Sequence, residues 1–242
     1  MPAVLRRAFA AAVLAAALPG VATAQAPADL GHQLYAEHCA ECHGSRGGGQ
    51  GDRGPRLAGV GELAADFYLR TGYMPLGEPG EQPTRHEPSF DDEQLDALIG
   101  YVASLGPGPG VPDPHPEQGN VSVGQRLFAS NCAGCHQIVA KGGYLTGVRA
   151  PSLDRATPVQ IAEAVRLGPY VMPRFDEQHL TEAQLDSLIA YVRYAKDPDD
   201  RGGWAIGRLG PIPEGLVTWV FGAVVLVAVC MVIGKRLRSE PE

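Results

Sequence analysis

Positive charge is scarce in this chain of 242 residues, where 20 Lys and Arg stand against 27 Asp and Glu and give a formal net charge of −7 at pH 7. Such an acidic balance argues against a nucleic acid as the partner. The shortage of positive charge lies in the first half of the chain. Residues 25–118 carry 5 basic and 15 acidic side chains, whereas residues 119–214 carry 10 of each. The acidic half is either an ordinary solvated surface or a docking face for a basic partner.

Cysteine is also scarce, and four of the five cysteines fall into two copies of the pattern Cys-x-x-Cys-His, at residues 39–43 and 132–136. This pattern attaches haem covalently. The two-residue spacing lets both sulfurs form thioethers along one edge of the porphyrin, and the adjacent histidine becomes an axial ligand of the iron. The fifth cysteine, Cys230, is left over, and we interpret it as an inert apolar residue.

A single Cys-x-x-Cys pair is also typical of a redox disulfide or of half a zinc site. The histidine that follows directly in both copies favours haem, and the sequence therefore predicts two covalently bound c-type haems. The predicted attachment residues and proximal ligands are Cys39, Cys42 and His43 for the first haem, and Cys132, Cys135 and His136 for the second.

The four methionines indicate the second axial ligands. Met1 is the initiator and Met231 lies in an apolar run, which leaves Met74 and Met172, each after a haem motif and each followed by proline. A thioether is a soft ligand that raises the potential of haem iron, and we predict that Met74 and Met172 are ligands rather than residues that only pack in a core. The alternative ligands are His86, His115 and His179.

Most of the chain is built twice. Gly31 and Tyr35 precede the first haem motif at the same offsets at which Gly124 and Phe128 precede the second. Residues 91–102 and 181–192, which follow the motifs, are identical at seven of twelve positions. Both segments have helical periodicity and capping signals at their starts. We therefore expect a mainly α fold in which each repeat has a helix at either end.

The two glycines predict how these terminal helices pack. A helix that carries glycine at a crossing can approach its partner closely, and we expect Tyr35 or Phe128 to meet Tyr101 or Tyr191 there. Between the repeats, residues 106–120 contain five prolines and four glycines, a composition typical of a semi-rigid spacer. The spacer either fixes the distance between the haems or only keeps two domains apart.

Both termini indicate export and a membrane. Arg6 and Arg7, an apolar run and a small-residue site at 22–24 predict a secretory signal. The paired arginines also resemble a twin-arginine signal, but we favour the general route, since haem is attached after export to an unfolded chain. An uncleaved signal that acts as a second anchor is an open alternative. Residues 215–234 form an uncharged run of twenty residues, long enough as a helix to cross about 30 Å of hydrocarbon.

The basic residues after this run predict a cytoplasmic C-terminus and haem domains on the extracytoplasmic side of the cell membrane. A buried helix of a soluble protein is the alternative interpretation of the run. The predicted organisation is a signal segment (1–24), a first domain (25–105), a linker (106–120), a second domain (121–198), a Gly-rich juxtamembrane segment (199–214), a transmembrane helix (215–234) and a tail (235–242).

Together these features resemble the diheme cytochrome c subunit of actinobacterial-type cytochrome bcc (quinol–cytochrome c reductase) complexes, over essentially the whole mature chain. Residues 202–215 are the most specific part, because they look like that subunit's Gly-Pro-x-x-Glu-Gly approach to its anchor. The resemblance implies two tandem class I cytochrome c domains. By analogy with such domains, Pro55 and Pro151 are expected to accept a hydrogen bond from the proximal histidines.

The resemblance also implies partners. Quinol would be oxidised at a cytochrome b subunit, and a Rieske iron–sulfur protein would pass electrons to this chain. The chain would then deliver them to a terminal cytochrome c oxidase, without a catalytic site of its own. The runner-up is a membrane-anchored diheme shuttle for a dehydrogenase or another oxidase. A diheme peroxidase or a gas sensor would need an open iron position.

Residues 77–89 lengthen the first domain relative to the second, and the sequence does not indicate a role for them.

Overall fold

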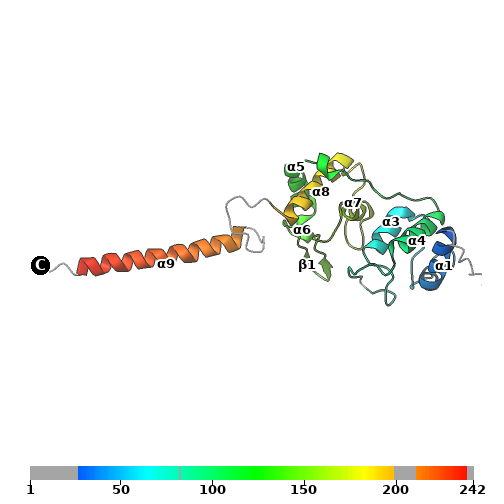
Figure 1. The fold of residues 1–242 in the computed structure, drawn as a ribbon, viewed down its shortest axis with the longest axis horizontal. Coiled ribbons are helices and arrows are strands. Elements are labelled where there is room, and N and C mark those ends of the chain that lie inside the picture. Colours follow the sequence, from blue (N-terminus) through cyan, green and yellow to red (C-terminus); the bar gives the residue numbers. More distant parts are fainter. Residues whose placement is uncertain (1–26, 82, 199–210, 239–242) are drawn as a thin grey trace, which may run out of the picture.

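The computed structural model describes residues 27–81, 83–198 and 211–238. The predicted signal segment, residues 199–210 with most of the juxtamembrane motif, and the last four residues lie outside the described part of the chain. The described chain is mainly helical and forms two similar units followed by one long helix (Figure 1). We call residues 27–105 the first unit and residues 121–198 the second unit.

The order of elements repeats from one unit to the next. The first unit contains α1 (Pro27–His38), α2 (Ala40–His43), α3 (Gly61–Arg70) and α4 (Asp92–Ser104). The second unit contains α5 (Val121–Asn131), α6 (Ala133–His136), α7 (Pro158–Leu167) and α8 (Glu182–Lys196). The second unit also has an antiparallel hairpin of β1 (Gly143–Leu145) and β2 (Val148–Ala150), in which Leu145 pairs with Val148. A short 3₁₀ helix, η1 (Pro116–Gln118), ends the linker.

The predicted crossing of terminal helices is confirmed in both units. A Cβ atom at Gly31 would overlap the carbonyl oxygen of Ala97 in α4, and one at Gly124 would overlap that of Ser187 in α8. The predicted aromatic pairs lie at these crossings, with ring centroids 4.9 Å apart for Tyr35 and Tyr101 and 5.3 Å apart for Phe128 and Tyr191. The absence of side chains at the two glycines thus lets the helix backbones touch.

Capping signals fix where α4 and α8, the last helices of the two units, begin. The Asp91 carboxylate accepts a hydrogen bond from the Gln94 amide at 2.9 Å, and the Gln94 side chain accepts one from the Asp91 amide at 3.1 Å. Thr181 and Gln184 form the same capping box at the start of α8. These reciprocal bonds satisfy amide groups that have no partner inside a helix.

The two units contact each other directly, through α3 of the first unit and α7 of the second (Figure 1). The interpretation that the Pro/Gly-rich linker keeps two domains apart is therefore wrong. The linker instead lies along both units, because the Leu63 amide donates to the Pro109 carbonyl at 3.1 Å and the His115 amide donates to the Asp186 carboxylate at 2.6 Å.

Each unit encloses its own apolar core, and the long C-terminal helix lies outside both. Fully buried residues in the two cores include Tyr35, Leu95 and Leu98 in the first unit and Phe128, Leu185 and Ile189 in the second. The C-terminal helix, α9 (Pro211–Arg238), extends past both ends of the predicted span 215–234. Its residues Gly215–Arg236 are apolar enough to cross a membrane, and none of that span is buried within the protein.

Candidate haem-binding sites

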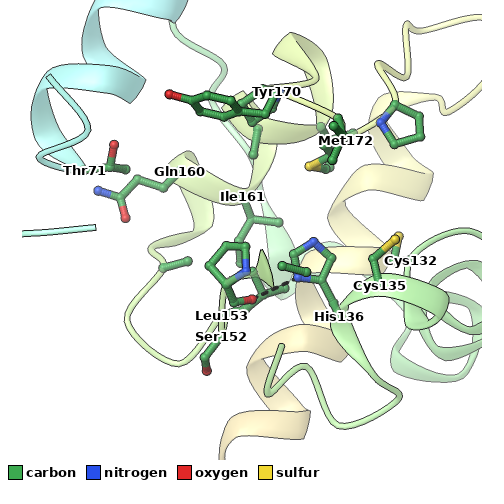
Figure 2. A pocket seen from close by; sticks show the side chains of 18 of the residues that line it. Thr71, Cys132, Cys135, His136, Ser152, Leu153, Gln160, Ile161, Tyr170 and Met172 are labelled. Atoms are coloured by element: carbon green, nitrogen blue, oxygen red, sulfur yellow. Dashed lines mark hydrogen bonds between the residues drawn. The ribbon is translucent and has the colours of Figure 1, made fainter. Parts of the chain in front are cut away.

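One cavity in the second unit gathers all the site residues that the sequence predicts for it. Cys132, Cys135, His136, Pro151 and Met172 all line this cavity. They come from the end of α5, from α6, from the loop after β2 and from the loop after α7. Figure 2 shows the His136 ring and the Met172 sulfur pointing into the cavity, with the two cysteines side by side at one end.

His136 is held in the form that ligates a metal. Its Nδ1 atom lies 3.1 Å from the carbonyl oxygen of Pro151 (Figure 2). Because a carbonyl oxygen only accepts, Nδ1 carries the hydrogen, and the lone pair remains on Nε2. Burial lowers the pKa of His136, and the bond to Pro151 opposes this only in part. The side chain is therefore a neutral imidazole, as an iron ligand must be.

Most of the remaining wall of the cavity is apolar and suits a flat macrocycle. It is formed by side chains of α5, α7, α8 and the loops between them: Phe128, Leu153, Ile161, Val165, Phe175 and Leu188. A ligand site of this kind is mostly apolar, with a few polar groups that fix orientation. The donor set of two thiols, one imidazole and one thioether around such a wall fits a covalently attached haem.

The cysteine environment does not fit the alternative interpretations. Burial, with a smaller contribution from the neighbouring Cys42 or Cys135, raises the pKa of Cys39 and of Cys132 to about 11. Redox-active cysteines instead have lowered pKa values, because they react as thiolates. Among the described residues, no group of three or more His, Cys, Asp and Glu side chains gathers to hold a metal ion.

The first unit repeats the arrangement around its own motif. The His43 Nδ1 atom lies 2.8 Å from the carbonyl oxygen of Pro55. Cys39 and Met74 both pack against the core of the first unit, as Cys132 and Met172 pack against that of the second. Gly54, before Pro55, lies so close to Cys42 that a Cβ atom would be 2.6 Å from the Cys42 carbonyl oxygen. This close approach brings the proline loop onto the haem motif.

The three alternative histidines are all exposed. His179 is bonded through Nδ1 to Asp176 at 2.7 Å, and its side chain is 72% exposed. The His115 ring lies 3.3 Å from Glu117 at a position that is also exposed. His86 is exposed as well, and none of these three histidines lines the cavity of the second unit.

Sequence reasoning missed that the first unit contributes to the second cavity. Phe67 and Thr71 at the end of α3, Tyr73 beside Met74, and Pro83 and Arg85 of the lengthened segment all line it. Arg85 reaches α7, where its Nη2 atom donates to the Gln160 side chain at 2.7 Å. No local pattern marks these residues, because their role depends on the contact between α3 and α7.

Comparison with known proteins gives matches for both units. Residues 28–106 match the family described as Cytochrome c, and residues 119–192 match the family described as Cytochrome C oxidase, cbb3-type, subunit III. The chain is 37% identical over 240 residues to the cytochrome bc1 complex cytochrome c subunit of Corynebacterium diphtheriae, covering 89% of this chain and 85% of that protein. It is 40% identical over 215 residues to the protein of the same description from Mycobacterium tuberculosis H37Rv, and the match covers 85% of this chain and 77% of that protein. The Cbb3-type cytochrome c oxidase subunit CcoP of Rhodobacter capsulatus is a more distant relative. It is 26% identical over 188 residues, and the match covers 68% of this chain and 61% of that protein.

Proposed function

The chain belongs to the family of cytochrome c subunits of the cytochrome bc1 complex, and from this premise we propose that it relays electrons from a Rieske iron–sulfur protein to a terminal cytochrome c oxidase. It has two cytochrome c domains and one long apolar C-terminal helix, and it is a diheme electron carrier of quinol–cytochrome c reductase. In the proposed complex, a cytochrome b subunit oxidises quinol and the Rieske protein delivers one electron at a time to this chain.

The residues of the second cavity would hold the haem in a defined orientation. Cys132 and Cys135 would attach it covalently, and His136 and Met172 would be the protein ligands of its iron. When bound, each haem supplies an iron that takes up and releases one electron. The apolar wall excludes water, which favours the less charged, reduced state, and the thioether ligand acts in the same direction. His43, Met74, Cys39 and Cys42 would have the corresponding roles in the first unit.

The contacts between the units suit a relay. The packing of α3 on α7, together with the linker bonds at Pro109 and His115, limits relative motion of the units and so keeps the separation between the two sites constant. We place α9 in the cell membrane as a single anchor. Lys235, Arg236 and Arg238 at its end support, by the positive-inside rule, a cytoplasmic C-terminus with the two haem units outside.

The observation that carries this proposal is the similarity to cytochrome bc1 subunits over most of the chain. It is tested by purifying the tagged full-length chain from membranes in a mild detergent. We expect cytochrome b and the Rieske protein to copurify, two c-type haems per chain by pyridine haemochrome, and reduction of both haems by a quinol. Two haems without cytochrome b and the Rieske protein would contradict the assignment and favour a diheme shuttle. A reporter fused after residue 242 tests the orientation, with cytoplasmic activity expected.

A further inference from the structure

The covalent chemistry of a c-type haem fixes where its carboxylates must lie. The thioether bonds form at the two vinyl positions along one edge of the macrocycle, and the two propionate groups project from the opposite edge. Once Cys132 and Cys135 hold the first edge, the propionates of the second haem must emerge on the far side of the cavity from these cysteines.

The far side of the cavity is polar and is built by both units. Figure 2 shows Gln160 of α7 and Thr71 of the first unit on the opposite side of His136 and Met172 from the cysteines. Arg85 is fixed at the same place, because its Nη2 atom donates to the Gln160 side chain at 2.7 Å and to the Arg155 carbonyl at 3.2 Å. The Tyr73 side chain lines the cavity beside it.

The side-chain hydrogen bonds of Arg85 leave its charge without an ion-pair partner among the described residues. Both of these bonds go to neutral acceptors. Burial is the largest influence on the pKa of Arg85 and lowers it, the neighbouring Arg155 lowers it further, and Glu87 raises it. A partly buried cation of this kind is costly unless an anion accompanies it.

We propose that Arg85, positioned by Gln160, binds a propionate carboxylate of the second haem, so that the lengthened segment of the first unit completes the haem site of the second. The guanidinium presents its donors in a planar fork that matches a carboxylate. The inference rests on the haem site proposed above but not on the identity of the electron partners. It gives residues 77–89 a function, and it makes the second haem site depend on the contact between the units.

The pair has a measurable electrostatic consequence. The ferric state carries one more positive charge than the ferrous state, so a positive charge near the iron disfavours it. A free, negatively charged propionate stabilises the ferric state, and pairing the propionate with Arg85 weakens this stabilisation. Both effects raise the reduction potential of the second haem, and loss of Arg85 should therefore lower it.

The test compares Arg85→Gln, Arg85→Lys and Arg126→Gln in the full-length, detergent-solubilised protein. Arg126 is an exposed arginine of α5 in the second unit and serves as the control for a loss of one charge. Redox titrations follow both haems, and Met172→Ala identifies which potential belongs to the second. We expect Arg85→Gln to decrease the equilibrium constant for reduction of the second haem on the order of tenfold, which is about 59 mV for one electron. Arg85→Lys should show a smaller decrease, since an ammonium lacks the fork, and Arg126→Gln should show almost none.

A purely structural role would give a different pattern. Loss of the bond to Gln160 alone would lower the thermal midpoint of Arg85→Gln and leave both potentials unchanged, and this result would overturn the proposal. If the Gln variant does not fold, Arg85→Lys decides, and a second-haem potential equal to that of the unmodified protein would overturn it. The pyridine haemochrome count separates these outcomes from a failure of the haem assignment, which would show as fewer than two haems per chain.

Discussion

At the scale of single residues, the second site depends on Met172, because His136 alone leaves the iron with an open position. We predict that Met172→Ala abolishes the near-infrared sulfur-to-iron absorption band of the second haem and lowers its potential, since the soft thioether that favours reduced iron is lost. His179→Ala is the matched control and should retain the band, because His179 is exposed and bonded to Asp176. Absorption spectra of the two variants decide, and a band that persists in Met172→Ala would disprove the assignment.

Glu163 is a second residue with an unusual environment. It is fully buried, and among the described residues neither of its carboxyl oxygens forms a hydrogen bond of good geometry, although the Asp66 carboxyl lies close to it. It faces Asp66 and Arg70 of α3 across the contact between the units. Burial, followed by the proximity of Asp66, raises the pKa of Glu163 to about 9, while Arg70 opposes the shift. The side chain is therefore neutral in the folded protein at pH 7.

This shift predicts a pH-dependent effect of Glu163→Gln. The folded state keeps a proton that the unfolded chain loses above its ordinary pKa, so the contribution of Glu163 to stability decreases as the pH rises from about 4.5 to about 9. Glu163→Gln removes this loss and should raise the free energy of unfolding at pH 7 by about 3 kcal/mol at most, with no gain at pH 4. Denaturant unfolding at both pH values measures the difference. The exposed control Glu177→Gln should show none, and an equal effect of Glu163→Gln at both pH values would contradict the prediction.

At the scale of helices, the crossing of α5 and α8 depends on the missing side chain of Gly124. A Cβ atom there would overlap the Ser187 carbonyl and come within 2.9 Å of the Tyr191 Cβ. Gly124→Ala should therefore destabilise the protein by about 1–3 kcal/mol, the usual cost of overpacking. Gly100→Ala in α4 is the control, because nothing lies within 4 Å of its Cβ position. It should be neutral or stabilising by up to about 1 kcal/mol. Unfolding of both variants, followed by circular dichroism, measures the difference, and equal effects would contradict this account.

The same helices show what the sequence predicts and what it does not. The starts of α4 and α8 follow from local capping bonds, such as that between Asp91 and Gln94, and local bonds can be read from neighbouring residues. The start of α7 has an equally clear signal in Thr157, Pro158 and Gln160, which the sequence reasoning did not use. The packing of α3 on α7 could not be predicted, because it depends on the shapes of two folded units.

The candidate sites divide in the same way. The residues around His136 were predictable, because the haem motif is contiguous and the scarcity of methionine leaves only one candidate per unit. Arg85 was not, because its partner Gln160 lies 75 positions away. Helix α9 is longer than the predicted run of residues 215–234. The run was defined by the absence of charged residues, whereas the helix continues as far as its backbone hydrogen bonds do.

At the scale of the whole molecule, charge is distributed between two units that are in contact. The first unit, residues 27–105, carries 13 acidic and 5 basic side chains, whereas the second unit, residues 121–198, carries 7 acidic and 8 basic ones. The first unit therefore has a negative field, and the second is nearly balanced. Such an asymmetry orients an approaching charged partner and speeds the encounter.

We predict that electron exchange between the solubilised protein and a basic soluble redox protein slows as salt is added. The rate should fall on the order of tenfold as the Debye length shrinks from about 30 Å at 0.01 M to about 8 Å at 0.15 M, because screening removes the attraction. Replacing the exposed Glu62 and Glu93 of the first unit with glutamine should weaken this salt dependence, whereas Glu177→Gln in the second unit should change it less. Stopped-flow rates at several salt concentrations test the prediction. A rate that does not respond to salt would mean that the acidic surface is only solvated and that docking depends on apolar contacts.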